Sequence, residues 1–344
     1  MHFIGIDLHK RIFTACVLND DEKVVEELVD IETDEKGLDF LMSRYPADDC
    51  RIVFENLTRA HFAFHYLYDH GYAVDVAHTG HGSLREIACT NLKNDRVDAY
   101  KLALVCKDLW SGRRFIRRTH IAECDVMRMK AVIRMCNEFS CIRDEMKLRI
   151  MEYMNLHNIP EHPKYRDVAG QRYRRYLLDM KDPALTGMIN MMSAAIDEIE
   201  AANTEIARFA EMSEDAGLLM TIKGVSALTA VTIVTAIDGI YRFETPERLV
   251  SYFGLAVRVS ESAGKQKKGH ITKEGDPLVR KYLANVVRNH AAFCPKADLS
   301  LFYKRKSGEM PHWKAVTAAM RKLVCQIWHM LTYREQYRPN VMKS

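Results

Sequence analysis

Four acidic residues carry most of the chemical information in this 344-residue sequence. Asp7 ends a short apolar segment that reads as a strand, and Glu55 ends another. Asp95 and Asp98 open a helical pattern, and their i, i+3 spacing places both side chains on one face. Gathered carboxylates repel one another unless cations lie between them, and Mg²⁺ prefers hard oxygen ligands. Two ions about 4 Å apart would hold the attacking and leaving oxygens of a phosphodiester, so the acids predict a nucleic-acid-processing site.

Each acid also has a structural explanation. An Asp after a strand is often a turn residue, Asp95 could cap the following helix, and Asp98 could simply interact with the helix dipole. Two acids at strand ends together with a D-x-x-D helix start are harder to explain by capping, which favours a metal-binding role for the group. For His9, shortly after Asp7, a polar turn residue is the commoner explanation.

The hydrophobic pattern predicts the elements that position the acids. We expect strands at 3–6, 12–18, 23–29, 52–54 and 73–77, and helices at 35–43, 59–70, 81–88 and 95–109. Three strands followed by strand–helix alternation, with acids at strand ends, are typical of a ribonuclease-H-like fold. Residues 1–112 are therefore predicted to form an acidic, metal-binding α/β domain.

The rest of the chain is predicted to be helical, so the expected fold class is α/β plus α. Residues 113–215 form a long-helix spacer with helices at 126–154 and 188–209 and a shorter helical segment around 165–180. Such pairs often make a coiled-coil dimer interface, although a self-contained spacer explains the pattern equally well. Residues 216–344 form a basic helical domain, in which Ile222-Lys-Gly-Val-Ser resembles a helix-hairpin-helix turn. Backbone N–H groups of such a turn can bind DNA phosphate without reading sequence.

The formal net charge of +4 hides a gradient along the chain. Residues 1–110 hold 12 Lys and Arg against 20 Asp and Glu, 111–255 hold 20 of each, and 256–344 hold 18 against 6. The basic last third favours a polyanionic partner, because each phosphate that is neutralised releases counterions. The residues expected to contact nucleic acid are Arg113, Arg114, Arg117, Arg118, Lys223, Gly224, Lys265, Lys267, Lys268, Lys273 and Arg280.

Cysteine usage and hydropathy favour a cytoplasmic protein. The nine cysteines form no C-x-x-C pair, which indicates reduced thiols rather than zinc ligands or disulfides. No apolar run approaches the roughly 18 residues that span a membrane, so no membrane association is expected. Asp7 interrupts the first hydrophobic stretch, which argues against a signal segment.

A second dense region runs from Tyr252 to Gly275 and is basic, hydroxyl-rich and punctuated by glycines. We expect a flexible cationic loop here. Such a loop could bind phosphate or present a serine nucleophile to one. From the residues alone, phosphate binding is favoured.

These motifs resemble those of transposases of insertion sequence 110, including its 1111 branch. Gly224-Val-Ser-Ala-Leu-Thr-Ala230 is similar to the family motif "pGiG..tA". The signature "GL.P....SG....gGrisK.G" is matched in register by Gly254-Leu255, Ser262, Gly264-Lys265, Gly269, Ile271-Thr-Lys273 and Gly275. The resemblance spans essentially the whole chain, with the acids near one end and the serine near the other.

The resemblance implies an N-terminal RuvC-like domain with a D-E-D-D acid set and a C-terminal transposase domain. It also implies roles for individual residues. Two Mg²⁺ ions, for which Mn²⁺ could substitute, would be bound by Asp7, Glu55, Asp95 and Asp98. Ser262 would attack a DNA phosphodiester and hold one DNA end covalently. The implied enzyme cuts and rejoins double-stranded donor and target DNA for a mobile element. It would act as a dimer or tetramer, directed by a non-coding guide RNA, at the nucleoid of a bacterium or archaeon.

The chain departs from the family pattern at three places. Asn-Leu-Thr-Arg follows Glu55 where the family has x-Thr-Gly, Val257 replaces a proline, and Ala263 replaces a glycine. Ser260 lies two residues from Ser262, so either serine is a candidate, with Ser262 favoured. Two other functions stay open: a Holliday-junction or structure-specific nuclease that uses water, and a non-catalytic nucleic-acid-binding scaffold.

Overall fold

The computed structural model describes residues 1–78, 94–113, 118–262 and 265–339, apart from the side chains of residues 258–268. The chain divides into two compact units, Met1–Ala122 and Glu123–Ser344, which we describe separately. The helix predicted at 81–88 lies outside the described residues. The domain boundaries predicted at 112 and 215 stay predictions.

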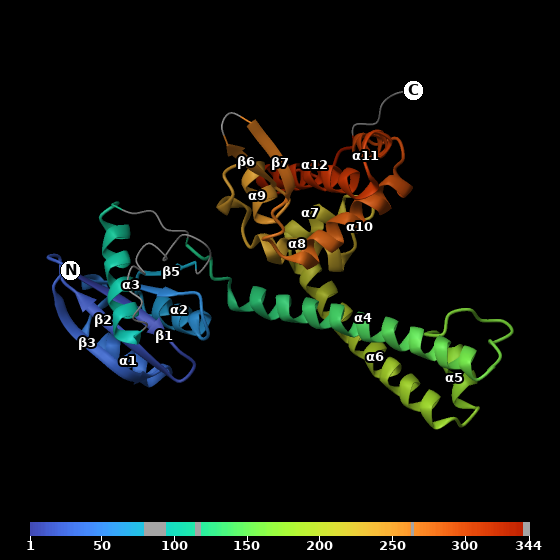
Figure 1. Cartoon of the computed structure of the whole chain (residues 1–344), viewed down its shortest axis with the longest axis horizontal. Helices are drawn as coiled ribbons and strands as arrows, with labels where there is room; N and C mark the ends of the chain where they lie inside the picture. The colour runs from blue at the N-terminus through green and yellow to red at the C-terminus, as the bar shows by residue number, and fades with distance from the viewer. Residues whose placement is uncertain (79–93, 114–117, 263–264, 340–344) are drawn as a thin grey trace. The chain divides into compact units, whose positions relative to one another are not determined.

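The first unit is built around a five-stranded mixed sheet (Figure 1). Its strands are β1 (His2–Leu8), β2 (Ile12–Leu18), β3 (Val24–Glu32), β4 (Cys50–Glu55) and β5 (Val74–Ala77), in the order β3-β2-β1-β4-β5. β1, β2 and β3 pair antiparallel, whereas β1 pairs parallel with β4 and β4 parallel with β5. All five strands were expected from the sequence, and the topology is consistent with a ribonuclease-H-like start.

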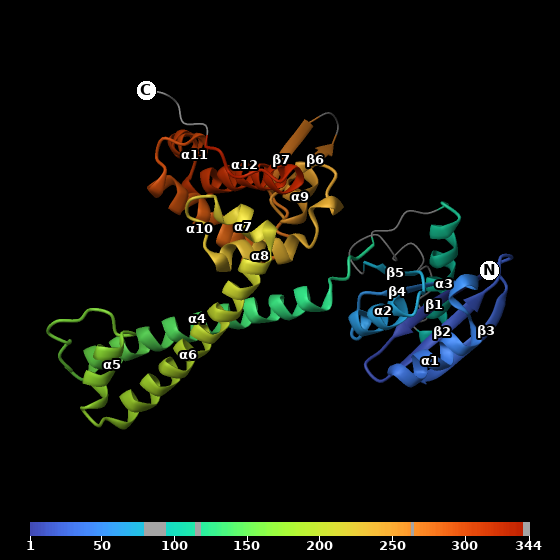
Figure 2. The same cartoon turned by 180° about the vertical axis from the view of Figure 1, so that it is seen from behind.

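Helices cover both faces of this sheet (Figure 1 and Figure 2). The helices α1 (Glu35–Arg44) and α2 (Ala60–Asp69) share a core with Ile4 and Ile6 of β1. On the opposite face, α3 (Asp95–Trp110) packs with Phe3. Because side chains alternate along a strand, the odd-numbered residues of β1 face α3. A short 3₁₀ helix at Ala47–Asp49 precedes β4.

Gly5 allows α3 to lie directly on β1. A Cβ atom at this position would lie 2.1 Å from the backbone nitrogen of Ala103 and 2.3 Å from the backbone oxygen of Ala99. A helix backbone cannot move aside as the end of a flexible side chain can. Any larger residue would therefore push α3, which carries two of the candidate metal-binding acids, away from the sheet.

We expect Gly5→Ala to lower the free energy of unfolding of the first unit by at least about 3 kcal/mol, the upper end of the usual cost of overpacking a core. Gly187→Ala in the second unit is a suitable control, because an added Cβ meets no atom within 4 Å there and alanine favours a helix. Urea unfolding followed by circular dichroism would measure both variants. An unchanged transition for Gly5→Ala would contradict the close approach of α3.

Two long helices and a short one open the second unit. The helices α4 (Cys124–Leu156) and α6 (Pro183–Met212) lie side by side, and α5 (Gln171–Leu178) lies near the end of this pair (Figure 1). At 33 residues, α4 is about 50 Å long. The end of the pair has a core of its own that includes Ile150 and Leu177. The sequence predicted these three helices.

The remaining elements surround the largest core of the described chain. They are α7 (Glu214–Met220), α8 (Ala227–Ile237), a 3₁₀ helix at Ile240–Arg242, α9 (Pro246–Tyr252), β6 (Val257–Ser262), β7 (Lys265–Ile271), α10 (Pro277–Phe293), α11 (Asp298–Glu309) and α12 (His312–Tyr333). The helix α12 contributes Leu323, Ile327 and Trp328 to this core. The indole nitrogen of Trp328 donates to the carbonyl oxygen of Phe243 at 2.8 Å, so the ring is a structural anchor.

The strands β6 and β7 correct one expectation. The segment around the two candidate serines is predicted as a flexible loop, but it forms a two-stranded antiparallel sheet. In its register, Ser260 is paired with Lys267 and Ser262 with Lys265. The alternation of Val257 and Val259 favours a strand. The glycines that follow these valines favour a loop, which is why the strand is not predicted.

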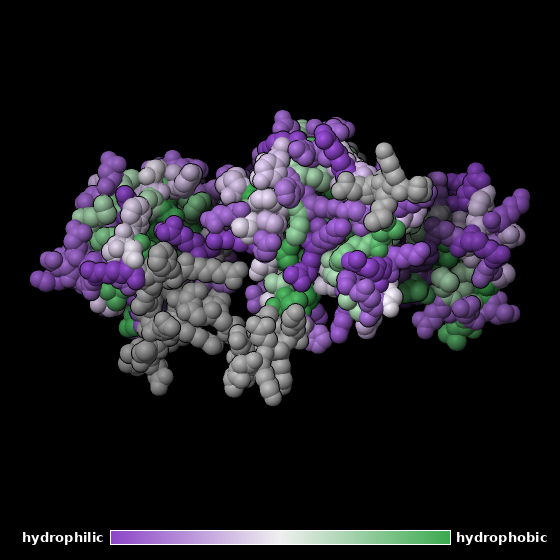
Figure 3. All heavy atoms as spheres, turned by 90° about the horizontal axis from the view of Figure 1, so that it is seen from above, coloured by the Kyte–Doolittle hydropathy of each residue, from purple (hydrophilic) through white to green (hydrophobic). Residues whose placement is uncertain are grey.

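The surface in Figure 3 is largely hydrophilic, with hydrophobic side chains exposed in patches between polar ones. Among the helices that the structure describes, none combines the length and apolar character needed to cross a membrane. Eight of the nine cysteines lie in the described ranges, and each of these eight is a free thiol.

Candidate active site

The strands β1 and β4 bring Asp7 and Glu55 to the same edge of the sheet. The two strands are parallel and pair Ile6 with Phe54, so Asp7 and Glu55 occupy the next step of each strand. Neighbouring residues in register point to the same face of a sheet. Both side chains therefore emerge on the face of Gly5, which is the face that α3 covers. Both residues are partly buried.

The N-terminus of α3 supplies the other two acids. Asn94 is the N-cap, because its side-chain oxygen accepts a hydrogen bond from the backbone nitrogen of Arg96 at 3.1 Å. The alternative in which Asp95 caps the helix is therefore wrong. Asp95 is the first helical residue, and its side chain is 55% exposed. Asp98 lies on the same face of α3 and is 3.5 Å from the Lys101 ammonium.

His9 joins the acids, which sequence reasoning missed. Its Nε2 atom lies 3.4 Å from Oδ2 of Asp7 and 3.6 Å from Oδ2 of Asp95. Ligand atoms of these three residues all lie within 4.8 Å of one another. The backbone nitrogen of His9 donates to the carbonyl oxygen of Ile12, so the residue does belong to a turn. That turn brings the His9 ring beside the acids. The position of His9, two residues after Asp7, is the feature of the sequence that could have predicted this.

Burial and like charges raise the pKa of Asp7 above its ordinary value. Desolvation is the main cause, and the carboxylates of Asp95 and Asp98 raise the pKa further, whereas His9 lowers it. An ionised carboxylate here is costly unless a cation is near. The carboxylate oxygens of Asp7 and Asp95, gathered beside His9, fit a hard divalent cation. Metal binding by the full set of Asp7, Glu55, Asp95 and Asp98 stays a prediction.

The predicted nucleic-acid contacts are only partly described. Arg113 is 3.3 Å from Glu22, and Arg118 is 3.1 Å from Asp75, so each forms an ion pair within the first unit. Lys223 and Lys273 are exposed. Arg114, Arg117 and the side chains of Ser262, Lys265, Lys267 and Lys268 lie outside the described part of the chain.

Two glycines of the second dense region have a packing role. Gly254 has a φ of +69°, and a Cβ there would lie 2.8 Å from the backbone nitrogens of Glu274 and Gly275. The guanidinium of Arg280 donates to the carbonyl oxygens of Phe253 and Gly275. Arg280 therefore holds together the two segments that lead into and out of β6 and β7. A contact of Arg280 with nucleic acid stays a prediction.

A tight turn at Lys223 and Gly224 joins α7 to α8. The backbone nitrogen of Val225 donates to the carbonyl oxygen of Ile222 at 3.0 Å, and Gly224 has a φ of +96°. Ser226 then caps α8 through its side chain. The structure thus shows a glycine-containing tight turn that leads into a helix. The helix-hairpin-helix motif and the binding of DNA phosphate by its backbone stay predictions.

A mixed five-stranded sheet with acids at the ends of β1 and β4 and on α3 is typical of metal-dependent enzymes that process nucleic acids. Comparison with family models agrees with this class. The model of the IS110 DEDD domain, described as a transposase, matches residues 4–158. The model described as the IS116/IS110/IS902 transposase family matches residues 216–304.

Two curated proteins are similar to this chain. A protein named "Probable family 20 transposase" from Pseudomonas aeruginosa is 20% identical over 347 residues, which cover 98% of each chain. The "Transposase for insertion sequence element IS1111A" from Coxiella burnetii is 29% identical over 138 residues, or 39% of this chain and 37% of that protein. The chain belongs to the IS110/IS1111 family of transposases and is a DNA transposase. The family implies that it binds DNA, and its DEDD domain is of a type that uses divalent metal.

Proposed function

We propose that this transposase cuts and rejoins DNA with a serine nucleophile and two Mg²⁺ ions. The ions would be bound by Asp7, Glu55, Asp95 and Asp98. The observation that supports this most is the convergence of Asp7 and Asp95, beside His9, where β1 ends. Mn²⁺ should replace Mg²⁺, because it accepts the same oxygen ligands. When bound, the metal supplies charge that polarises the scissile phosphate and offsets the negative charge that develops on it.

In the proposed reaction, Oγ of Ser262 attacks the phosphorus of a DNA phosphodiester. A serine–phosphate ester forms, the bond from phosphorus to one deoxyribose oxygen breaks, and that oxygen leaves as a hydroxyl. The proton that the serine loses balances the proton that the leaving oxygen gains. Attack by another deoxyribose hydroxyl reverses these steps and rejoins the strand. Its place in the family-like signature favours Ser262 over Ser260.

The proposed partners are double-stranded donor and target DNA and a guide RNA from the mobile element. The excess of Lys and Arg in residues 256–344, 18 against 6 acids, supports a polyanionic partner. Lys223 and Lys273 are exposed, so their ammonium groups are accessible to phosphates. The guide RNA rests on the family resemblance alone.

We propose further that the protein acts as a dimer or tetramer joined through a coiled coil of α4 and α6. Exposed apolar side chains on these helices support the proposal. Leu148, Leu156 and Met191 are 68%, 78% and 55% exposed. A second chain packed along these helices would remove these apolar side chains from water, which favours association.

A strand-transfer assay tests the proposed function. The protein would be purified with RNA transcribed from the flanking element and mixed with labelled donor and target DNA and Mg²⁺. Joined donor–target products should form, stop with EDTA and return with excess Mn²⁺. Cleaved but never joined DNA would support the water-using nuclease instead, and binding without cleavage would support the scaffold.

A further inference from the structure

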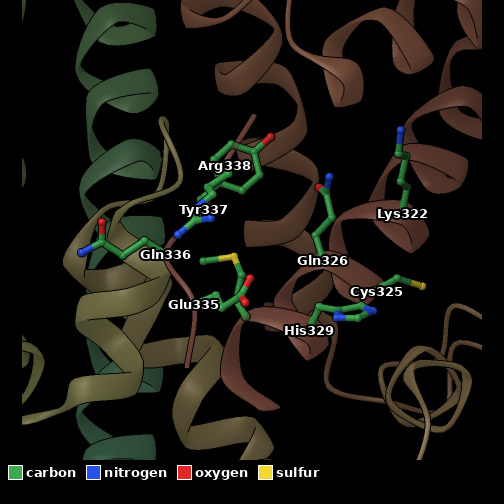
Figure 4. A pocket seen from close by; sticks show the side chains of 9 residues that line it. Lys322, Cys325, Gln326, His329, Glu335, Gln336, Tyr337 and Arg338 are labelled. Carbon is green, nitrogen blue, oxygen red and sulfur yellow. The ribbon is translucent and has the colours of Figure 1, made fainter. Parts of the chain in front are cut away.

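The last described residues fold back along the second unit. Arg334 has a φ of +57° and ends α12, and the backbone nitrogen of Glu335 donates to the carbonyl oxygen of Met330 at 3.0 Å. We call residues 334–338 the C-terminal strap. Figure 4 shows Tyr337 and the other labelled strap residues beside α12 side chains that include Gln326, around a pocket of about 380 Å³. The matched family models end at residue 304, so they do not cover this segment.

The strap contacts α7 and the turn that follows it. Arg334 forms an ion pair with Asp215 of α7. The backbone nitrogen of Tyr337 donates to the hydroxyl of Thr221 at 2.9 Å. Thr221 lies two residues before Lys223, so the strap is anchored beside the turn that is the candidate for phosphate binding.

His290 on α10 links the strap to the turn itself. The residue is 0% exposed, and its Nδ1 atom lies 2.9 Å from the carbonyl oxygen of Lys223. A carbonyl oxygen only accepts, so Nδ1 must carry the hydrogen, and in the neutral ring Nε2 is then an acceptor. The hydroxyl of Tyr337, 3.2 Å away, donates to Nε2. Burial raises the pKa of Tyr337 to about 12, so the phenol keeps its proton.

The backbone of the turn rests on the same part of α10. A Cβ atom on Gly224 would lie 3.0 Å from Cβ of Asn289 and 3.2 Å from the backbone nitrogen of His290. The turn therefore packs against α10, and the His290 ring holds the carbonyl group of Lys223 by a hydrogen bond. The Lys223 carbonyl sets the tautomer of that ring, and the Tyr337 hydroxyl holds the ring from its other nitrogen.

We propose that Tyr337 and His290 are positioning residues for DNA binding, and that the C-terminal strap holds the Lys223–Gly224 turn in the orientation that contacts phosphate. This inference rests on the proposed phosphate contact of the turn. A purely structural strap would affect folding but would have no specific coupling to Lys223. Coupling between Tyr337 and Lys223 in DNA affinity is therefore the decisive quantity.

A double-mutant cycle measures this coupling. Binding of the full-length protein to a fluorescent duplex DNA would be titrated at several salt concentrations. Lys223→Ala should weaken binding about threefold to tenfold and reduce the salt slope by about one. Tyr337→Phe keeps the ring and removes only the hydroxyl; it should weaken binding about threefold and lower the slope in the same direction. Adding it to Lys223→Ala should cause a clearly smaller loss than it causes in the wild type.

Tyr303→Phe is the matched control, because the Tyr303 hydroxyl contacts His312 at 3.3 Å and makes no hydrogen bond with the turn in the described part of the chain. It should bind DNA like the wild type. Full additivity of Tyr337→Phe and Lys223→Ala would overturn the inference. So would an equal loss of affinity in Tyr303→Phe, because the effect would then not be specific to the strap.

A second measurement separates the inference from the proposed function. If Lys223→Ala changes neither affinity nor salt slope, the phosphate contact itself is wrong. Limited trypsin digestion at the Lys223–Gly224 bond then tests the strap without DNA. Tyr337→Phe should speed this cleavage about fivefold or more relative to Tyr303→Phe, and equal rates would overturn the positioning role.

Discussion

Ser262→Ala protein is expected to bind donor and target DNA normally but to form no covalent protein–DNA adduct. The alanine removes the oxygen that would bond to phosphorus and leaves the backbone of the β6–β7 hairpin free to keep its register. Strand transfer should fall at least about a thousandfold, because loss of a nucleophile is not compensated by the rest of a catalytic site. DNA affinity should change by less than about twofold.

Covalent trapping on denaturing gels measures this directly, with labelled DNA, the element RNA and Mg²⁺. Ser260→Ala is the matched control, since the two serines belong to the same strand and lie two residues apart. Ser260→Ala should retain the adduct. Loss of the adduct in Ser260→Ala alone would move the nucleophile to that residue. Cleaved DNA without an adduct in the wild type would mean that water is the nucleophile.

The arrangement of the first unit could be predicted because its signals are local. Apolar runs and turn residues indicated the strands, and an acid at the end of each of two parallel strands is brought to a common edge by the register of Ile6 with Phe54. The i, i+3 spacing of Asp95 and Asp98 needed only a helix to become a shared face. The elements of the first unit follow from short-range periodicity, and a single sequence is enough to show that periodicity.

Other features depend on contacts between distant segments. His9 reaches Asp95 only because β1 and β2 turn back beneath the start of α3. Gly5 looks like any strand glycine until the backbone of α3 lies on it. The β6–β7 hairpin is predicted as a loop, since its glycines and lysines obscure the alternating valines, and its strand pairing appears only in the structure.

The C-terminal strap is the most distant of these cases. Tyr337 and Thr221 are 116 residues apart, and no periodic pattern connects them. The basic composition of the last third indicated a polyanionic partner, but it could not show which residues fix the shape of the contact. A buried polar contact such as that of His290 cannot be predicted from the sequence, because the fold must first bring its partners together.

Asp7→Asn should abolish strand transfer, by at least about a thousandfold, and also make the metal-free protein more stable. Asp7 is partly buried beside two other acids, so its ionised form is disfavoured in the fold. Because its pKa is raised, the metal-free protein loses stability as the pH rises above the ordinary range of an Asp carboxyl. Asparagine has the same shape without the charge and removes this dependence.

Thermal unfolding with and without Mn²⁺ separates this explanation from simple damage to the fold. Metal at about one hundred times its Kd should stabilise the wild type by about 2.7 kcal/mol, and Asp7→Asn should lose most of that gain. Asp21→Asn is the control, because Asp21 is exposed in the β2–β3 turn; it should keep both activity and the metal effect. An Asp7→Asn protein that still transfers strands and is still stabilised by metal would show that the acids at the end of β1 are not the metal site. A variant that is more stable without metal yet inactive with it would show that Asp7 is kept for chemistry at the expense of the fold.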